Sequence, residues 1–155
     1  MKVLVLYYTK TGHTLEAAKA TAEGIRSAGS EADLVPVEDF DVTQLSGCDA
    51  LVVGCPCWAG ITGRAVLPPS MERALNALPE GMLVGKRCGG VSVHSGTGAE
   101  ATVRHIGEVL AQKGCEDYRP GPVARAGVPF SLWVGPAVSP EDESQFRAYG
   151  TAFVS

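Results

Sequence analysis

The stretch that follows the first apolar run is rich in hydroxyl groups and contains one glycine. It consists of Thr9, Lys10, Thr11, Gly12, His13 and Thr14. The threonines offer hydroxyl donors, and Gly12 lets the backbone turn tightly and approach a ligand closely. A helix that begins near Thr14 would add free N–H groups and the positive end of its dipole. These features predict a cradle for a phosphate group, although a capped strand–helix loop would have the same composition.

A second stretch places an aromatic ring among small residues. It consists of Pro56, Cys57, Trp58, Ala59 and Gly60. The Trp58 indole could stack on a planar ligand, and Gly60 would let a peptide reorient beside it. A tryptophan that covers the end of the sheet is the alternative. We assign no catalysis to Cys55 or Cys57, because buried free cysteine is commoner than reactive cysteine and no His or Lys lies close in sequence to activate it.

A third stretch combines glycines with hydroxyl groups after the fourth apolar run. It consists of Ser95, Gly96, Thr97 and Gly98. Such residues suit a close approach of the backbone to a ligand, whereas the preceding His94 is best explained as a strand-end histidine. A ligand with a phosphate at one end and a flat ring at the other would use all three stretches. Their shared composition favours such a ligand over three ordinary loops.

The elements that must position these stretches alternate along the chain. Continuous apolar runs predict strands, and apolar positions three or four apart predict helices. The expected strands are 3–8, 32–37, 50–55 and 87–94, with a fifth strand or strand fragments in 128–134. The expected helices run from near Thr14 to Gly29, from a Ser70 cap, from 99 to 114 and from a Ser139 cap.

Strands that alternate with helices indicate right-handed crossovers and a parallel sheet covered on both faces. The sequence therefore predicts one three-layer α/β domain of residues 1–155. In such a sheet, ligands bind beyond the carboxyl ends of the strands. Because each of the three stretches follows a predicted strand, we expect them to meet at one edge of the sheet.

The composition excludes several classes of function. Of the 155 residues, 45% are hydrophobic and 19% are charged, which is typical of a globular domain. A net charge of −4 argues against nucleic-acid binding, and the apolar runs are too short to span a bilayer. Met1 and Lys2 lead straight into an apolar run without a cleavage site, so we expect no secretory signal. Five cysteines without a C-x-x-C pair favour reduced thiols, a cytoplasmic protein and no metal site.

Together these residues resemble the flavodoxin family. The first stretch is similar to its FMN-phosphate loop, and Gly54-Cys55-Pro56-x-Trp58 is similar to the segment that places a tryptophan against the isoalloxazine ring. Gly96-Thr97-Gly98 is similar to the start of the second ring-binding loop. The resemblance implies a flavodoxin-like fold of the short-chain form, with five parallel strands in the order 2-1-3-4-5. It also implies non-covalent FMN, bound by the three stretches.

Other features resemble NAD(P)H:quinone oxidoreductases of the tryptophan-repressor-binding type. The shared features are the first stretch, the Ser95–Gly98 turn, the Gly127–Phe130 segment and the late helix with Tyr149-Gly150. This chain lacks room for the insertions that help those enzymes form tetramers. It also departs from flavodoxins, because Cys57 stands where they carry Thr or Ser. Its mild acidity weakens the interpretation as a shuttle that docks through a strongly negative face.

We therefore expect an FMN-binding, flavodoxin-like electron-transfer protein that exchanges electrons with redox partner proteins. An NAD(P)H-dependent flavin enzyme that reduces quinones or similar acceptors is the first alternative. A flavin-free interaction module with the same fold is the second. In both redox interpretations the flavin carries the chemistry, so no side chain has to act as a catalytic acid or base. We expect a monomer or small homo-oligomer without nucleic-acid or membrane partners.

Overall fold

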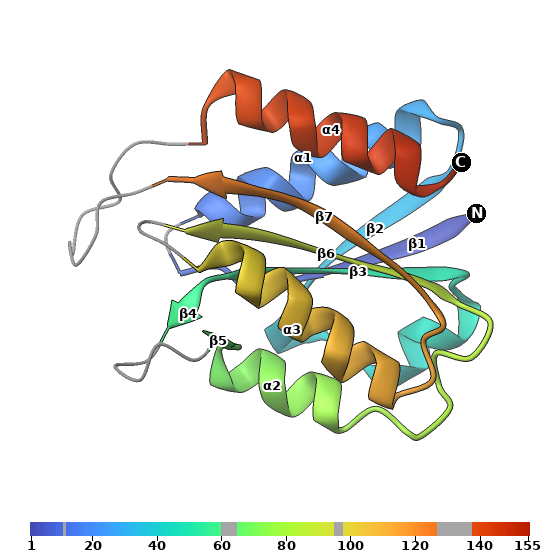
Figure 1. Cartoon of the computed structure of the whole chain (residues 1–155). Helices are drawn as coiled ribbons and strands as arrows, with labels where there is room; N and C mark the ends of the chain where they lie inside the picture. Colours follow the sequence, from blue (N-terminus) through green and yellow to red (C-terminus); the bar gives the residue numbers. More distant parts are fainter. Residues whose placement is uncertain (11, 60–64, 95–97, 127–137) are drawn as a thin grey trace.

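Five parallel strands form the central sheet of the computed structural model, in the order β2-β1-β3-β6-β7 (Figure 1). They are β1 (Lys2–Tyr7), β2 (Glu31–Pro36), β3 (Ala50–Pro56), β6 (Arg87–His94) and β7 (Asp117–Arg125). A separate antiparallel ribbon pairs β4 (Trp58–Ala59) with β5 (Ala65–Val66). The structure describes residues 1–10, 12–59, 65–94, 98–126 and 138–155. Counted in chain order, the sheet strands follow 2-1-3-4-5, which confirms the predicted flavodoxin-like α/β fold.

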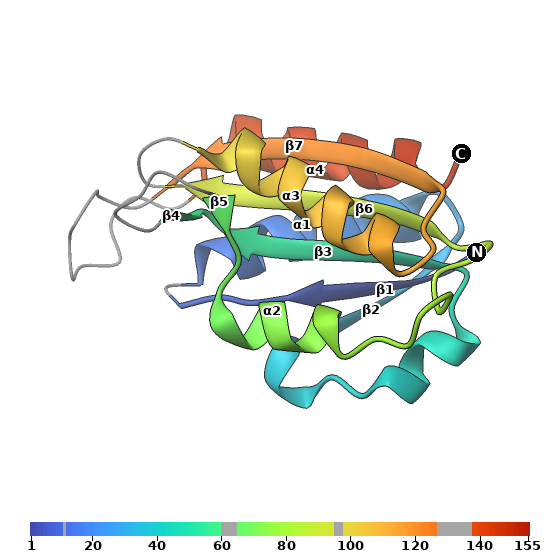
Figure 2. The ribbon, with the colours of Figure 1, turned by 60° about the horizontal axis from the view of Figure 1, so that its bottom comes forward.

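Helices cover both faces of this sheet, as Figures 1 and 2 show. One face carries α1 (His13–Ser27) and α4 (Pro140–Phe153), and the other carries α2 (Pro69–Asn76) and α3 (Ala99–Gln112). Two short 3-10 helices, Val37–Asp39 and Val42–Gly47, connect β2 to β3. The result is the expected three-layer arrangement of helices, sheet and helices.

The central strand β1 is buried on both faces, which explains its continuous apolar run. Leu4 and Leu6 belong to the core cluster on the side of α2 and α3. Val3 and Val5 belong to the cluster on the side of α1 and α4. This division follows from the strand itself, because successive side chains point to opposite faces of a sheet.

Glycines allow α1 and α4 to pack with their backbones in contact. A Cβ atom at Gly24 would overlap the carbonyl oxygen of Arg147, and one at Gly150 would overlap the carbonyl oxygen of Thr21. The Thr151 hydroxyl also donates to the Gly24 carbonyl oxygen at 3.1 Å. The last helix is therefore held directly against the helix that begins at the predicted phosphate cradle.

The fifth strand was misplaced by the sequence-based prediction. The strand is β7, whose Pro120, Gly121 and Pro122 are typical of a loop. Because β7 lies at the edge of the sheet, one side of its backbone needs no ladder bonds, and proline is tolerated there. The segment 128–134, where the strand was expected, lies outside the described residues.

The expected cap of α2 at Ser70 was also wrong. The helix begins at Pro69 with Pro68 as its N-cap, so Ser70 lies inside the first turn. Proline suits the first helical position, because its fixed φ is helical and its missing N–H would have no helical partner there. The sequence contained this signal in the pair of prolines.

The other predicted helix ends are confirmed. Gly29 and Gly114 follow α1 and α3 with φ values of 85° and 100°, which glycine adopts without strain. The Ser139 hydroxyl oxygen accepts the N–H of Asp142 at 3.1 Å and caps α4. Within the described ranges, none of the helices combines the length and apolar character needed to cross a membrane.

Candidate functional site

The carboxyl ends of β1, β3 and β6 lie at the same edge of the sheet (Figure 1). Backbone hydrogen bonds continue just past the strands at this edge. The Tyr8 N–H donates to the Gly54 carbonyl oxygen and the Cys57 N–H donates to the Val93 carbonyl oxygen, both at 3.0 Å. The three stretches singled out in the sequence leave the sheet here, so the fold brings their starting points together.

The first stretch forms a turn that opens the N-terminus of α1. The Gly12 N–H donates to the Thr9 hydroxyl oxygen at 2.9 Å, which ties the turn together. Gly12 is the N-cap and has a φ of 92°. Because a glycine cap has no side chain, it leaves the first N–H groups of the helix uncovered. Among the described residues, nothing would lie within 4 Å of a Cβ atom at Gly12, so the structure leaves space in front of this end of the helix.

Two neighbours of Gly12 are buried and support the turn from below. His13 is 5% exposed, and its Nδ1 lies 3.6 Å from Oε1 of Glu16. Thr14 is also buried, and its methyl group packs beside the backbone of Gly54 on β3. The His13 side chain therefore does not point into solvent.

Of the remaining members of the first stretch, the structure describes Thr9 and Lys10 but not Thr11. Lys10 is exposed at the rim of the turn. Thr9 is half-buried, and its hydroxyl keeps its own hydrogen available for donation while its oxygen accepts from Gly12. Thr11 lies outside the described residues, so its predicted contact with a phosphate stays a prediction.

Glu16 connects this turn to a distant part of the chain. Its Oε2 accepts the backbone N–H of Val138 at 2.9 Å, across 122 positions of sequence. The same carboxylate lies beside His13. The first turn of α1 is thereby joined to the segment that leads into α4. Sequence reasoning missed this contact, because its two residues lie 122 positions apart.

The second stretch leaves β3 and turns into the ribbon of β4 and β5. Pro56 ends β3, and Cys57 is half-buried. Trp58 and Ala59 form β4, where their backbones pair with Val66 and Ala65. The Trp58 ring and the Ala59 side chain are not described, and Gly60 lies outside the described residues. The predicted stacking of Trp58 on a flat ring therefore stays a prediction.

The third stretch ends at a second helix N-terminus with the same construction. Gly98 is the N-cap of α3 and has a φ of 99°. A Cβ atom there would lie 3.1 Å from the sulfur of Cys57, so the second and third stretches are in contact. The predicted contacts of Ser95, Gly96 and Thr97 fall outside the described residues. The glycine before each helix was visible in the sequence, but the matching left-handed conformations were not.

The thiols near this edge differ in their surroundings. Cys55 is fully buried on β3, and burial raises the pKa of its thiol well above the ordinary value. A thiol that stays protonated is a poor nucleophile. Cys57 is half-buried and touches the start of α3, whereas Cys48, Cys88 and Cys115 are buried free thiols. The assignment of no catalytic role to Cys55 agrees with this burial.

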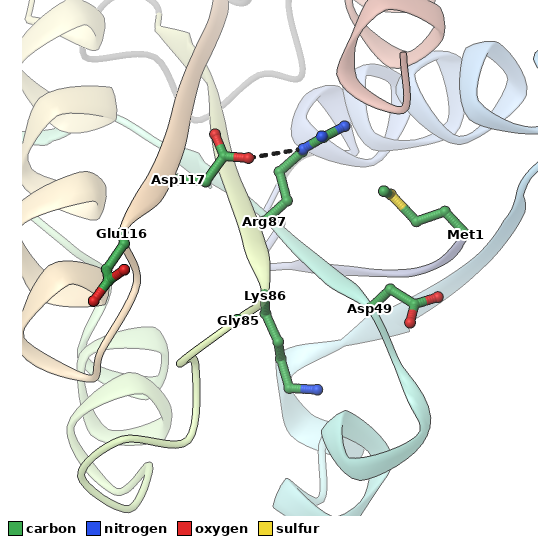
Figure 3. A pocket seen from close by; sticks show the side chains of 7 residues that line it. All are labelled: Met1, Asp49, Gly85, Lys86, Arg87, Glu116 and Asp117. Atoms are coloured by element: carbon green, nitrogen blue, oxygen red, sulfur yellow. Dashed lines mark hydrogen bonds and ion pairs between the residues drawn. The ribbon is translucent and has the colours of Figure 1, made fainter.

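A pocket of about 420 Å³ lies at the opposite end of the strands, and Figure 3 shows its lining. The cationic side chains of Lys86 and Arg87 already have partners within the chain. Nζ of Lys86 donates to the Cys48 carbonyl oxygen at 2.5 Å. The Arg87 guanidinium donates to Asp117 at 3.0 Å and to the Phe153 carbonyl oxygen at 2.6 Å. These contacts join strand ends to the C-terminal helix, and we assign this pocket no ligand.

Comparison with known proteins agrees with the fold. A family model described as flavodoxin matches residues 5–126. An NAD(P)H dehydrogenase (quinone) of Chromohalobacter salexigens is 30% identical over 181 aligned residues, covering 99% of this chain and 83% of the relative. A flavodoxin of Aquifex aeolicus is 41% identical over 61 residues, covering 39% of this chain and 33% of the relative.

Solved structures show the same fold at low sequence identity. The crystal structure of oxidised flavodoxin 1 from Bacillus cereus superposes with a TM-score of 0.79 at 19% identity, covering 99% of this chain and 97% of that one. The family match spans most of the chain, from β1 to the end of β7, and a relative aligns along nearly all of it. The chain belongs to the flavodoxin family.

Proposed function

We propose that this protein binds FMN at the carboxyl edge of its sheet and transfers electrons through it. The observation that carries the proposal is the pair of helix N-termini at this edge. Both α1 and α3 begin after a glycine with positive φ, at Gly12 and Gly98, and neither cap has a side chain. Uncovered N–H groups and the positive ends of two helix dipoles suit a ligand that carries a phosphate.

The residues of the first turn fit the phosphate group of FMN. Because no described atom lies within 4 Å of a Cβ built at Gly12, a phosphate can approach the backbone there. Thr9 holds the turn and can donate its hydroxyl hydrogen. Lys10 supplies a cationic side chain at the rim, and the His13 imidazole lies buried beneath the turn. Bound FMN would supply the redox chemistry by accepting and releasing electrons.

The second and third stretches would hold the ring of the flavin. They are in contact through Cys57 and Gly98, so a ring between them would meet two adjoining backbones. Trp58 would cover one face of the ring. The role of the chain at this end is to orient the ring, to exclude water from it and to limit which acceptors reach it.

Electron exchange with protein partners is the function that we favour. The family match and the segment shared with the flavodoxin of Aquifex aeolicus support it. Reduction of quinones by NAD(P)H is the second candidate, and the relative that aligns along nearly the whole chain supports it. The two differ in how electrons arrive: singly from a protein, or as a hydride from a nicotinamide.

Reconstitution with FMN tests the shared part of the proposal. The purified chain should take up an equimolar amount of FMN and turn yellow, with quenching of flavin fluorescence. Riboflavin is the matched control, because it has the ring without the phosphate, and it should bind much more weakly. A chain that stays colourless with excess FMN would overturn both redox functions and favour a flavin-free interaction module.

Anaerobic reduction then separates the two candidates. For an electron carrier we expect two resolved one-electron steps in a potentiometric titration and slow reduction by NADPH or NADH. Rapid bleaching by either nucleotide, followed by turnover with a soluble quinone, would instead establish the enzyme. A single two-electron step together with fast nucleotide oxidation would rule out the carrier.

A further inference from the structure

An apolar groove of about 670 Å³ runs along one side of the molecule, between α3 and the edge strand β7. Figure 2 shows these two elements side by side. The floor and one wall are apolar or small. They consist of Val103, Gly107, Ala111, Tyr118, Pro120, Gly121, Pro122 and Val123. The groove begins at Glu100, two residues after Gly98 of the candidate site, and runs away from it along α3, so its use does not depend on the proposed function.

The strand that forms one wall leaves apolar surface that no other described part of the chain covers. Residues 121–123 of β7 are only half-buried and Pro120 is exposed, whereas residues 88–93 of the neighbouring strand β6 are buried. The prolines at 120 and 122 lack the N–H groups that a further strand would need for its ladder. An occupant of this groove therefore packs through side chains, and a helix is the element suited to that.

The other wall carries a regular pattern of charge. Glu100, Arg104 and Glu108 are exposed and line the groove at successive turns of α3. Residues four apart on a helix lie on the same face, about 6 Å apart along the axis. Glu108 also lies 3.6 Å from Nδ1 of His105, but its side chain stays 63% exposed and can reach outward.

This pattern is complementary to itself. When two copies of α3 lie antiparallel about a two-fold axis level with residue 106, Arg104 of each copy faces Glu108 of the other. That axis passes near the middle of the groove, which α3 lines from Glu100 to Ala111. A two-fold contact uses the same patch on both subunits, so each favourable charge pair occurs twice.

We infer that the groove between α3 and β7 is the contact surface of a homodimer, in which two copies of α3 pack antiparallel. The apolar floor supplies the buried area, and the paired Arg104 and Glu108 set the register. Charge pairs at an interface fix register and orientation more than they add affinity. The occupant of the groove is therefore the α3 helix of a second copy of this chain, and not a strand added to the edge of the sheet.

Sedimentation equilibrium of the full chain tests this interface. The wild type should show a monomer–dimer equilibrium that weakens as salt is added, because the paired charges are screened. In Arg104→Glu, the glutamate at position 104 of each copy faces Glu108 of the other copy, which makes two repulsive pairs. The dissociation constant of the dimer should therefore rise on the order of tenfold or more. Arg104→Glu with Glu108→Arg exchanges the charges and should restore dimerisation.

A matched double variant makes the register falsifiable. The double variant Arg104→Glu with Glu100→Arg has the same composition as Arg104→Glu with Glu108→Arg. It leaves the glutamate at position 104 opposite Glu108 of the other copy, so it should not restore the dimer. Circular dichroism of each variant confirms that it is folded. A monomer at every concentration would overturn the interface, and so would a dimer that ignores Arg104→Glu. Equal rescue by both double variants would overturn the register.

Discussion

At the scale of single residues, backbone conformation marks the candidate site more clearly than any reactive side chain. Gly12 and Gly98 both take positive φ directly before a helix, at the same edge of the sheet. A left-handed residue costs an L side chain about 1–2 kcal/mol, whereas glycine adopts it freely. Both positions therefore tolerate only glycine well, because any other residue would be strained by the positive φ and would place a side chain in the space beyond the backbone.

Gly12→Val should abolish measurable FMN binding. The side chain would strain the turn and project into the open space where the phosphate is proposed to lie. The matched control is Gly29→Val, at the other end of α1, where φ is 85° and a Cβ also has nothing within 4 Å. Both variants should lose similar stability in urea, but only Gly12→Val should lose FMN binding in a fluorescence titration. Tight binding by Gly12→Val would contradict our placement of the phosphate.

The sequence predicted the composition of the cradle but not its support. Hydroxyl groups and one glycine after an apolar run indicated a phosphate loop, because those chemical groups are local properties of the chain. The burial of His13 and the bond from Val138 to Glu16 depend on how α4 packs. No local pattern encodes a contact across 122 positions, so this part could come only from the structure.

At the scale of elements, the fold depends on how closely its first and last helices approach. Gly24 of α1 and Gly150 of α4 each face a carbonyl oxygen of the opposite helix. Glycine normally weakens a helix by about 1 kcal/mol relative to alanine. Here it is required, because the helix axes are too close for a methyl group at either position.

Gly24→Ala and Gly150→Ala should each destabilise the chain by about 1–2 kcal/mol net, although alanine favours an isolated helix. The added methyl group must push two backbones apart, and overpacking typically costs about 1–3 kcal/mol before any gain in helix propensity. Urea unfolding followed by circular dichroism measures the change. Unchanged or raised midpoints would show that α1 and α4 can separate at little cost.

The sheet edge near Asp117 should make stability depend on pH in the acid range. Hydrogen bonds from Arg87, and then from Arg119, hold the pKa of this carboxyl below its ordinary value. A depressed pKa stabilises the folded state above the unfolded pKa of about 4, and the contribution is lost as pH falls through the folded value. Asp117→Asn removes this pH-dependent contribution to stability.

Urea midpoints of the wild type and Asp117→Asn, measured from neutral to acid pH, test this dependence. The difference between the two should be largest near neutrality and should shrink below about pH 4. Glu80→Gln, at an exposed loop position, controls for the loss of one negative charge. A difference between wild type and Asp117→Asn that stays constant with pH would rule out the ionic contribution.

The order of elements was predictable, whereas the fifth strand was not. Buried strands such as β1 and β3 have continuous apolar runs that no other element of that length matches. β7 instead contains Pro120 and Pro122, and only its place at the sheet edge makes them acceptable. That place is a property of the whole sheet, so a local interpretation of these residues favours a loop.

At the scale of the whole molecule, ligand binding and folding are linked. A ligand that binds only the folded state stabilises it by about 2.7 kcal/mol at a hundredfold excess over its dissociation constant. For a chain of this size, FMN should then raise the melting temperature by about 5–10 °C. Riboflavin at the same concentration should give a much smaller shift. Equal shifts for both compounds would show that the phosphate contributes nothing.

The packing of α4 on α1 also has a consequence for how the protein is made. The face of α1 that carries Gly24 packs against α4, and the ribosome synthesises α4 after all five strands of the sheet. Domains fold from their N-terminal end during synthesis, but this layer can close only when residues 140–153 have left the exit tunnel. Until then the nascent chain exposes apolar residues of α1 and one face of the sheet, and such surface favours misassembly.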